Sequence, residues 1–136
     1  MIKVYQTKFG CPGGNCFQAS VASLLELELE EVPDFANEDH DNWWKNFSEW
    51  IEKRGLSLAS SLVNDKLYPV TCIIEGYCLL GVVSKTDKSY RHSVIGHATC
   101  SQNRIKFKIV HDPYPGSDLT DPYDIKDVIW VVQNAA

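Results

Sequence analysis

Residues 13–25 read GGNCFQASVASLL, a glycine-rich turn that leads directly into an apolar segment of helical period. Asn15 is a suitable N-cap residue, so we expect a helix from Asn15 to about Leu29 with Cys16 in its first turn. A thiol at this position lies at the positive end of the helix dipole, beside backbone N–H groups that have no partner within the helix. Both features favour a thiolate and an oxyanion site, which makes Cys16 a candidate nucleophile. The alternative is that Cys16 is a small buried side chain of a core helix.

The composition of the chain is that of one globular domain spanning residues 1–136. Its 136 residues are 44% hydrophobic and 23% charged, which is enough apolar material to bury a core. Thirteen basic and eighteen acidic residues give a formal charge of −5, and no basic stripe is present, so nucleic-acid binding is disfavoured. The N-terminus has no apolar stretch of signal-peptide length and no apolar run approaches a bilayer span. We therefore expect a cytoplasmic protein with neither a nucleic-acid nor a membrane partner.

The five cysteines do not form a recognisable disulfide or metal-binding pattern. Their number is odd and they are scattered through strand-like and turn-like segments, which favours reduced thiols. Cys11 and Cys16 are separated by four residues, but no second close pair of cysteines or histidines completes a set of four ligands. The loop over residues 10–15 also lacks the Gly-Lys-Ser/Thr ending of a phosphate-binding loop. The sequence therefore predicts no metal and no cofactor.

The remaining elements predict an α+β fold. A second helix is expected from about Asp39 or Asp41 to Lys53, and its aromatic residues recur at helical spacing, which is more typical of core packing than of a ligand platform. Strands are expected over residues 58–62, 70–75, 78–84, 93–99, 105–111 and 128–132. Helices followed by successive strands indicate N-terminal helices packed on a C-terminal antiparallel sheet.

Residues 91–100 and 104–112 form a predicted β-hairpin. If residues 101–103 make a three-residue loop with Asn103 in the left-handed conformation, the numbers of paired residues sum to 204. This register places His92 directly opposite Asp112, close enough for the carboxylate to orient the imidazole. A two-residue loop would take the two side chains out of register.

His92 is the preferred general base among the four histidines. In the predicted register His97 points to the opposite face and lies in the core beside Phe107, which favours a structural role. His111 also points away from the face of His92, and His40 lies in an acidic loop. An orienting role for Asp112 competes with a simpler one, because Asp is common in turns that end strands.

The motifs CFQASVASLL at residues 16–25, HSVI at 92–95 and VHDP at 110–113 occur in an order that resembles the papain-like cysteine peptidases. Within that superfamily the likeness is closest to the small double-glycine peptidases that process bacteriocin leaders. The chain also resembles short uncharacterised phage and bacterial proteins with a Gly-Asn-Cys turn. The resemblance implies a papain-like fold, a triad of Cys16, His92 and Asp112, and a peptide or protein substrate.

The chain departs from this superfamily at two positions. The oxyanion glutamine of the superfamily stands a few residues before the nucleophile, whereas Gln6 stands ten residues before Cys16, so Gln6 is an oxyanion candidate only. Phe17 follows the nucleophile where the double-glycine peptidases carry Gly, which bears on substrate access. Cys11 is a rival nucleophile, although Pro12 and the glycine after it do not resemble a helix start.

These residues together predict a hydrolase that cleaves a peptide, isopeptide or amide bond through a thioester on Cys16. Transfer of the acyl group to an amine would use the same intermediate. The competing class is a catalytically inactive papain-like module that binds a protein partner through its Trp-rich helix or its acidic surface.

Overall fold

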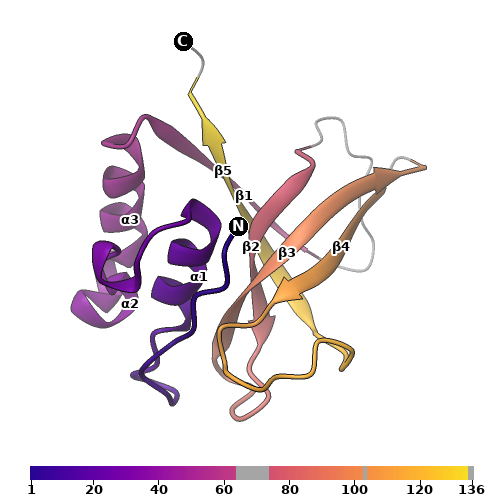
Figure 1. The fold of residues 1–136 in the computed structure, drawn as a ribbon, viewed down its shortest axis with the longest axis horizontal. Helices are drawn as coiled ribbons and strands as arrows, with labels where there is room; N and C mark the ends of the chain where they lie inside the picture. Colours follow the sequence, from indigo (N-terminus) through magenta and orange to yellow (C-terminus); the bar gives the residue numbers. More distant parts are fainter. Residues whose placement is uncertain (64–73, 103, 135–136) are drawn as a thin grey trace.

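The structure, a computed structural model, describes residues 1–63, 74–102 and 104–134. Within them, helices form one layer and an antiparallel sheet forms the other, as Figure 1 shows. The helices come first in the chain: α1 (Cys16–Leu25), α2 (Phe35–Glu38) and α3 (Trp43–Glu52), with 3-10 turns at Leu29–Glu31 and His40–Asn42. The strands follow: β1 (Leu56–Leu62), β2 (Gly76–Val83), β3 (Arg91–Ser101), β4 (Arg104–His111) and β5 (Ile125–Gln133). The predicted α+β arrangement, with the first helix starting at Cys16, is confirmed.

The strands lie in the order β1-β5-β2-β3-β4, so the last strand of the chain inserts between the first two. Helix α1 packs on β3 and β2, and α3 packs on β1. Five of the predicted strands are present with somewhat longer bounds. Of the sixth, predicted over residues 70–75, residues 70–73 lie outside the described residues. No helix in the described ranges is long and apolar enough to cross a membrane.

Both main helices are shorter than predicted. Helix α1 ends at Leu25 rather than near Leu29, because Glu26 adopts a left-handed conformation with φ of 58° and its N–H donates to the Ala22 carbonyl. Helix α3 begins at Trp43, since the residues before it form a separate 3-10 turn.

A hydrophobic core lies between the helices and the sheet. Its fully buried members include Val21 on α1, Phe47 and Ile51 on α3, and Ile95 on β3. Phe17 contacts Phe47 edge to face at a ring separation of 4.9 Å, so α1 and α3 are joined through aromatic rings. The aromatic residues of α3 thus contribute to the core, as predicted: Phe47 is buried and Trp43 and Trp50 pack against it partly buried, whereas Trp44 is exposed.

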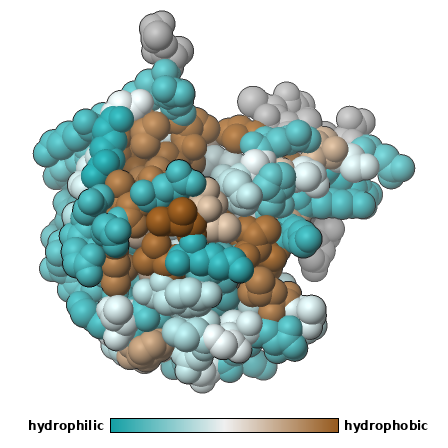
Figure 2. All heavy atoms as spheres, in the orientation of Figure 1, coloured by the Kyte–Doolittle hydropathy of each residue, from teal (hydrophilic) through white to brown (hydrophobic). Residues whose placement is uncertain are grey.

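A second apolar cluster lies on the other face of the sheet. Its buried members are Cys78, Leu80, Val82, Val94, Ala98, Val128 and Trp130. Figure 2 shows that hydrophobic residues also reach the surface over α1 and the neighbouring part of the sheet, with hydrophilic residues around them.

The predicted β3–β4 register is wrong by one residue. Ser101 pairs with Arg104 and His97 pairs with Lys108, so the paired numbers sum to 205 instead of 204. Gln102 has a left-handed φ of 53°, as the turn of a tight hairpin requires. Asn103, to which the prediction assigned that conformation, lies outside the described residues.

The position predicted for His97 is also wrong. A shift of one residue turns each side chain of a strand pair toward a different partner. Phe107 faces Ala98, and His97 is half-buried with its ring packed edge to face on Tyr77, which is 47% exposed. His97 therefore lies outside the core.

A β-bulge then changes the register a second time. Gly96 pairs with Ile109, but the next residue of β3, Ile95, pairs with His111, so Val110 is the extra residue of β4. Beyond the bulge the paired numbers sum to 206. Because this sum is even, His92 and Asp112 return to the same face of the sheet.

Candidate active site

The candidate site lies where β4 separates from β3. The last pair of the described β3–β4 ladder is Ile95 with His111, and beyond it the edge of β3 is bound by α1. The Ser93 N–H donates to the Cys16 Sγ at 3.5 Å, and the Ser20 hydroxyl donates to the Ser93 carbonyl at 3.1 Å. Cys16 and Ser20 are one helical turn apart, so one face of α1 takes the place of β4 along this edge. These two bonds hold Cys16 beside His92.

Asp112 and His92 form the closest polar contact of the site. The Asp112 Oδ1 lies 2.6 Å from the His92 Nε2, and the side chains are 4% and 19% exposed. Oδ1 also accepts the Tyr114 N–H at 2.9 Å, and Oδ2 accepts the Tyr123 hydroxyl at 3.0 Å. A carboxylate that accepts several hydrogen bonds is stabilised in its ionised form. The predicted contact between His92 and Asp112 is therefore present, although it arises from a different register.

Cys16 as well as Asp112 influences the charge of the His92 ring. Burial disfavours the charged imidazole, but hydrogen bonds with Asp112 and Cys16 and the negative charges of both raise the pKa of His92 to about 9. Burial would likewise raise the pKa of Asp112, but the hydrogen bond and charge of His92, with the Tyr114 and Tyr123 contacts, hold it below its usual range. The ring is thus protonated at neutral pH between two groups that favour its charge.

Asn15 occupies the predicted N-cap position of α1, but its side chain makes no capping hydrogen bond to the helix. Its Oδ1 accepts the N–H groups of Thr7 and Lys8 at 2.9 and 2.8 Å, and its Nδ2 donates to Gln18 at 3.0 Å. The amide is used in this way because an extended N-terminal segment with two free N–H groups lies against it. Among the described residues, no acceptor binds the N–H of Cys16, which leaves this donor open at the helix start.

Gln6 is held next to the start of α1. Its Nε2 and the Asn15 N–H donate to the same Lys8 carbonyl, at 3.0 and 3.2 Å. Its backbone N–H donates to the Pro113 carbonyl at 3.0 Å, directly after Asp112. Gln6 is only 6% exposed, and its Oε1 has no hydrogen-bond partner in the described part of the chain. The fold therefore places the oxyanion candidate between the helix start and the segment of Asp112.

The rival nucleophile Cys11 is not bound to a histidine. Its Sγ lies 3.6 Å from the Ser84 hydroxyl and 3.9 Å from the Thr86 hydroxyl, across the loop between β2 and β3. His111 is occupied elsewhere, because its Nε2 donates to the Val4 carbonyl at 2.7 Å and the residue is 2% exposed. Among the described cysteines, Cys16 is thus the one that interacts with His92.

Phe17 points away from these polar groups. Its ring packs against Trp43 and Phe47 in the helical layer. Phe17 therefore helps to fix the helix that carries Cys16.

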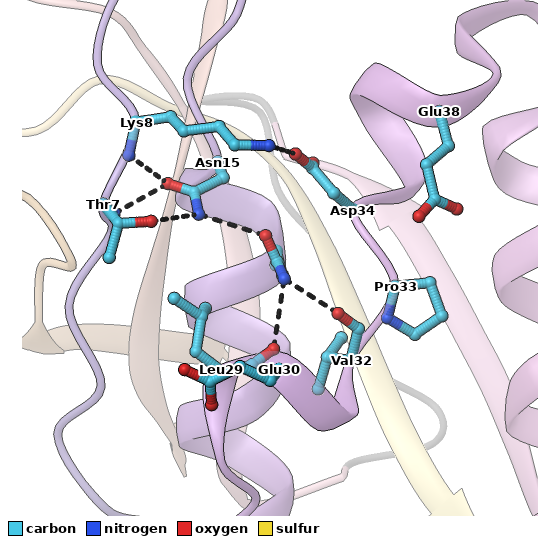
Figure 3. A pocket seen from close by; sticks show the side chains of 10 residues that line it. Thr7, Lys8, Asn15, Leu29, Glu30, Val32, Pro33, Asp34 and Glu38 are labelled. Carbon is cyan, nitrogen blue, oxygen red and sulfur yellow. Dashed lines mark hydrogen bonds and ion pairs between the residues drawn. The ribbon is translucent and has the colours of Figure 1, made fainter.

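A pocket of about 380 Å³ lies on another side of α1 and is drawn in Figure 3. Lys8 reaches across it to Asp34 at 3.1 Å, and Gln18 donates to the carbonyls of Leu29 and Val32. Gln18 lies two residues after Cys16, which places it on the opposite side of the helix. The polar groups of this pocket bind one another, and neither Cys16, His92 nor Asp112 lines it.

Tyr114 and Tyr123 contact Asp112 and were not among the site residues predicted from the sequence. Tyr114 contributes a backbone N–H, which any residue could supply, and Tyr123 lies in an irregular segment before β5 that carries no periodic signal. These contacts depend on how the irregular segment after Pro113 folds back onto Asp112, which a local sequence pattern does not predict. Within the described ranges, no group of three or more His, Cys, Asp or Glu side chains is arranged to hold a metal ion.

A comparison of the chain with protein-family models, with curated proteins and with solved structures found no significant match.

Proposed function

We propose that the protein is a cysteine hydrolase that cleaves a peptide, isopeptide or amide bond through a thioester on Cys16. The observation that carries this proposal is the position of His92, whose Nε2 lies 2.6 Å from the Asp112 Oδ1 while the N–H of the next residue, Ser93, donates to the Cys16 Sγ at 3.5 Å. A nucleophile, a base and a group that orients the base are the components that acyl transfer requires. Their order along the chain resembles that of the papain-like cysteine peptidases.

The geometry supports the following reaction. The Cys16 thiolate, paired with the protonated His92, attacks the acyl carbon and forms a tetrahedral intermediate. His92 then gives its proton to the leaving nitrogen, and the C–N bond breaks to leave a thioester. Water attacks the thioester while His92 accepts its proton, which releases the acid and restores the thiolate. Asp112 keeps the Nε2 side of the ring fixed and stabilises the imidazolium.

The start of α1 would stabilise the oxyanion. The Cys16 N–H is available there, and the partial positive charge of the helix N-terminus favours a negative oxygen. Gln6 Nε2 has a second hydrogen besides the one that it donates to Lys8, and we assign it as the other donor.

A peptide library analysed by mass spectrometry tests the proposal. We expect the wild-type protein to cleave a subset of peptides, and Cys16→Ala and His92→Ala to lose detectable turnover. Cys100→Ala serves as the matched control, because it removes another partly exposed thiol at the far end of β3. Cleavage by Cys100→Ala but not by Cys16→Ala, with an acyl adduct trapped on Cys16, would support the assignment.

Three other outcomes have defined meanings. Turnover that survives in Cys16→Ala would exclude this nucleophile. Amide products formed with an added primary amine, in preference to hydrolysis, would identify a transferase on the same thioester. Absence of any acyl adduct on Cys16, together with capture of a protein partner by wild type and Cys16→Ala alike, would favour the binding module.

A further inference from the structure

Tyr123 binds the oxygen of Asp112 that His92 leaves free. Its hydroxyl donates to Oδ2 at 3.0 Å, whereas His92 and the Tyr114 N–H are bound by Oδ1. Asp112 is 6% exposed, so solvent has little access to Oδ2. Among the described residues, Tyr123 supplies the hydrogen-bond donor to Oδ2.

This contact restricts the rotation of the carboxylate. The terminal torsion of an Asp side chain has broad energy minima, so a carboxylate held at one oxygen alone can turn about its axis. With donors on both oxygens, the plane of the carboxylate is fixed, and Oδ1 remains directed at the His92 Nε2. Loss of the Tyr123 hydroxyl would also leave a buried charged oxygen without its donor.

Tyr123 is itself held in place from the loop between β2 and β3. The Lys85 ammonium lies 4.5 Å from the centre of the Tyr123 ring and 3.5 Å from the Asp121 carboxylate. Burial and the negative charge of Asp112 raise the pKa of Tyr123, so its hydroxyl keeps its proton and remains a donor. The groups on the carboxylate are thus one cationic ring, one backbone amide and one neutral hydroxyl.

We propose that Tyr123 is a positioning residue that acts through Asp112 to fix His92 against Cys16. The inference rests on the proposed function, because it assigns Tyr123 to the same reacting groups. The Tyr123 hydroxyl contacts Asp112, so its effect on the sulfur must pass through the carboxylate.

A double-mutant cycle measures this dependence. Tyr123→Phe removes the hydroxyl alone, and the alkylation rate of Cys16 by iodoacetamide at neutral pH reports the reactivity of the sulfur without any substrate. We expect Tyr123→Phe to slow alkylation by about tenfold in the wild-type background, the order expected for loss of a hydrogen bond to a charged group. In the Asp112→Ala background the same change should alter the rate by less than about twofold.

Tyr77→Phe is the matched control, since Tyr77 lies on β2 opposite His97, away from His92. In this variant Cys16 should be alkylated at the wild-type rate. An equal loss of alkylation rate on Tyr123→Phe in both backgrounds would overturn the proposal, as would a Tyr123→Phe rate equal to that of wild type.

The NMR signal of the His92 Nε2 proton gives a second readout, and we expect this proton to exchange faster with water in Tyr123→Phe than in Tyr77→Phe. If Cys16 proves unreactive in the wild type, the proposed function loses its nucleophile. The NMR comparison then decides the role of Tyr123 alone, with unchanged exchange in Tyr123→Phe counting against it.

Discussion

Asp112 and His92 meet at 2.6 Å because a bulge in β4 compensates for a turn that is one residue shorter than predicted. At the turn the register sum is 205, which would leave the two side chains on opposite faces of the sheet. The extra residue at the bulge raises the sum to 206 at the last pair, Ile95 with His111. An even sum puts Asp112, the next residue, on the same face as His92, where the two side chains reach each other.

The shared contacts of His92 predict how its titration responds to substitution. We expect NMR to give wild-type His92 a pKa of about 9, and Cys16→Ser to lower it, because the hydrogen bond and charge of Cys16 both favour the protonated ring. Cys100→Ser, on the far part of β3, should leave the pKa unchanged. A His92 pKa that is the same in Cys16→Ser and wild type would show that the sulfur and the ring do not interact.

His92 also predicts how stability depends on pH. Its pKa is raised from the ordinary histidine value of 6.5 to about 9 in the folded protein, so the folded chain retains a proton that the unfolded chain releases. The contribution of His92 to the free energy of unfolding is therefore complete below pH 6.5 and is lost as pH rises through about 9. Urea unfolding across this interval should show a decline in wild type that is smaller in His92→Gln. Parallel pH profiles would contradict the raised pKa.

The structure reverses the stability expectation for His97 and adds one for His111. His111 is buried and donates to the Val4 carbonyl, so His111→Ala should lower the free energy of unfolding by about 1–3 kcal/mol through the lost bond. His97 is half-buried against Tyr77, and His97→Ala should cost less than about 1 kcal/mol. Chemical denaturation compares the two variants directly. A larger loss of unfolding free energy for His97→Ala than for His111→Ala would show that His97 is the histidine in the core.

The aromatic residues of α3 should act on stability according to their burial. Phe47 is fully buried between Phe17 and Phe35, so Phe47→Ala should cost about 3–5 kcal/mol. Trp44 is 40% exposed, and Trp44→Ala should cost distinctly less. Thermal unfolding of the two variants measures the difference. If Trp44→Ala were the more damaging change, the core assignment of the stripe would be wrong.

The sequence was sufficient for the features that depend on local patterns. The periodicity after Asn15 predicted a helix that starts at Cys16, and alternation predicted the two strands next to which His92 and Asp112 were expected. The register was missed because the bulge at Val110 has no separate signal in an alternating strand, and an error of one residue changes every partner.

The contacts of the N-terminal segment could not be predicted for a different reason. Asn15 is a residue type that commonly caps helices, but its amide binds Thr7 and Lys8, whose approach to the helix depends on the tertiary fold. The same segment brings Gln6 to the Lys8 carbonyl and to Pro113. The distance of ten residues from Cys16 therefore says little about where Gln6 lies in space.

Selective alkylation of the thiols tests the central claim that His92 and Asp112 activate Cys16. The folded protein is treated with substoichiometric iodoacetamide near neutral pH, and the adduct on each cysteine is quantified by mass spectrometry. We predict that Cys16 reacts faster than Cys100 and far faster than Cys78, whose burial raises its pKa to about 12. His92→Ala should slow Cys16 by about tenfold or more, and Asp112→Asn should slow it less, because an orienting group is partly replaceable. If Cys16 reacts no faster than Cys100, or if His92→Ala leaves its rate unchanged, Cys16 is not an activated nucleophile and the account is contradicted.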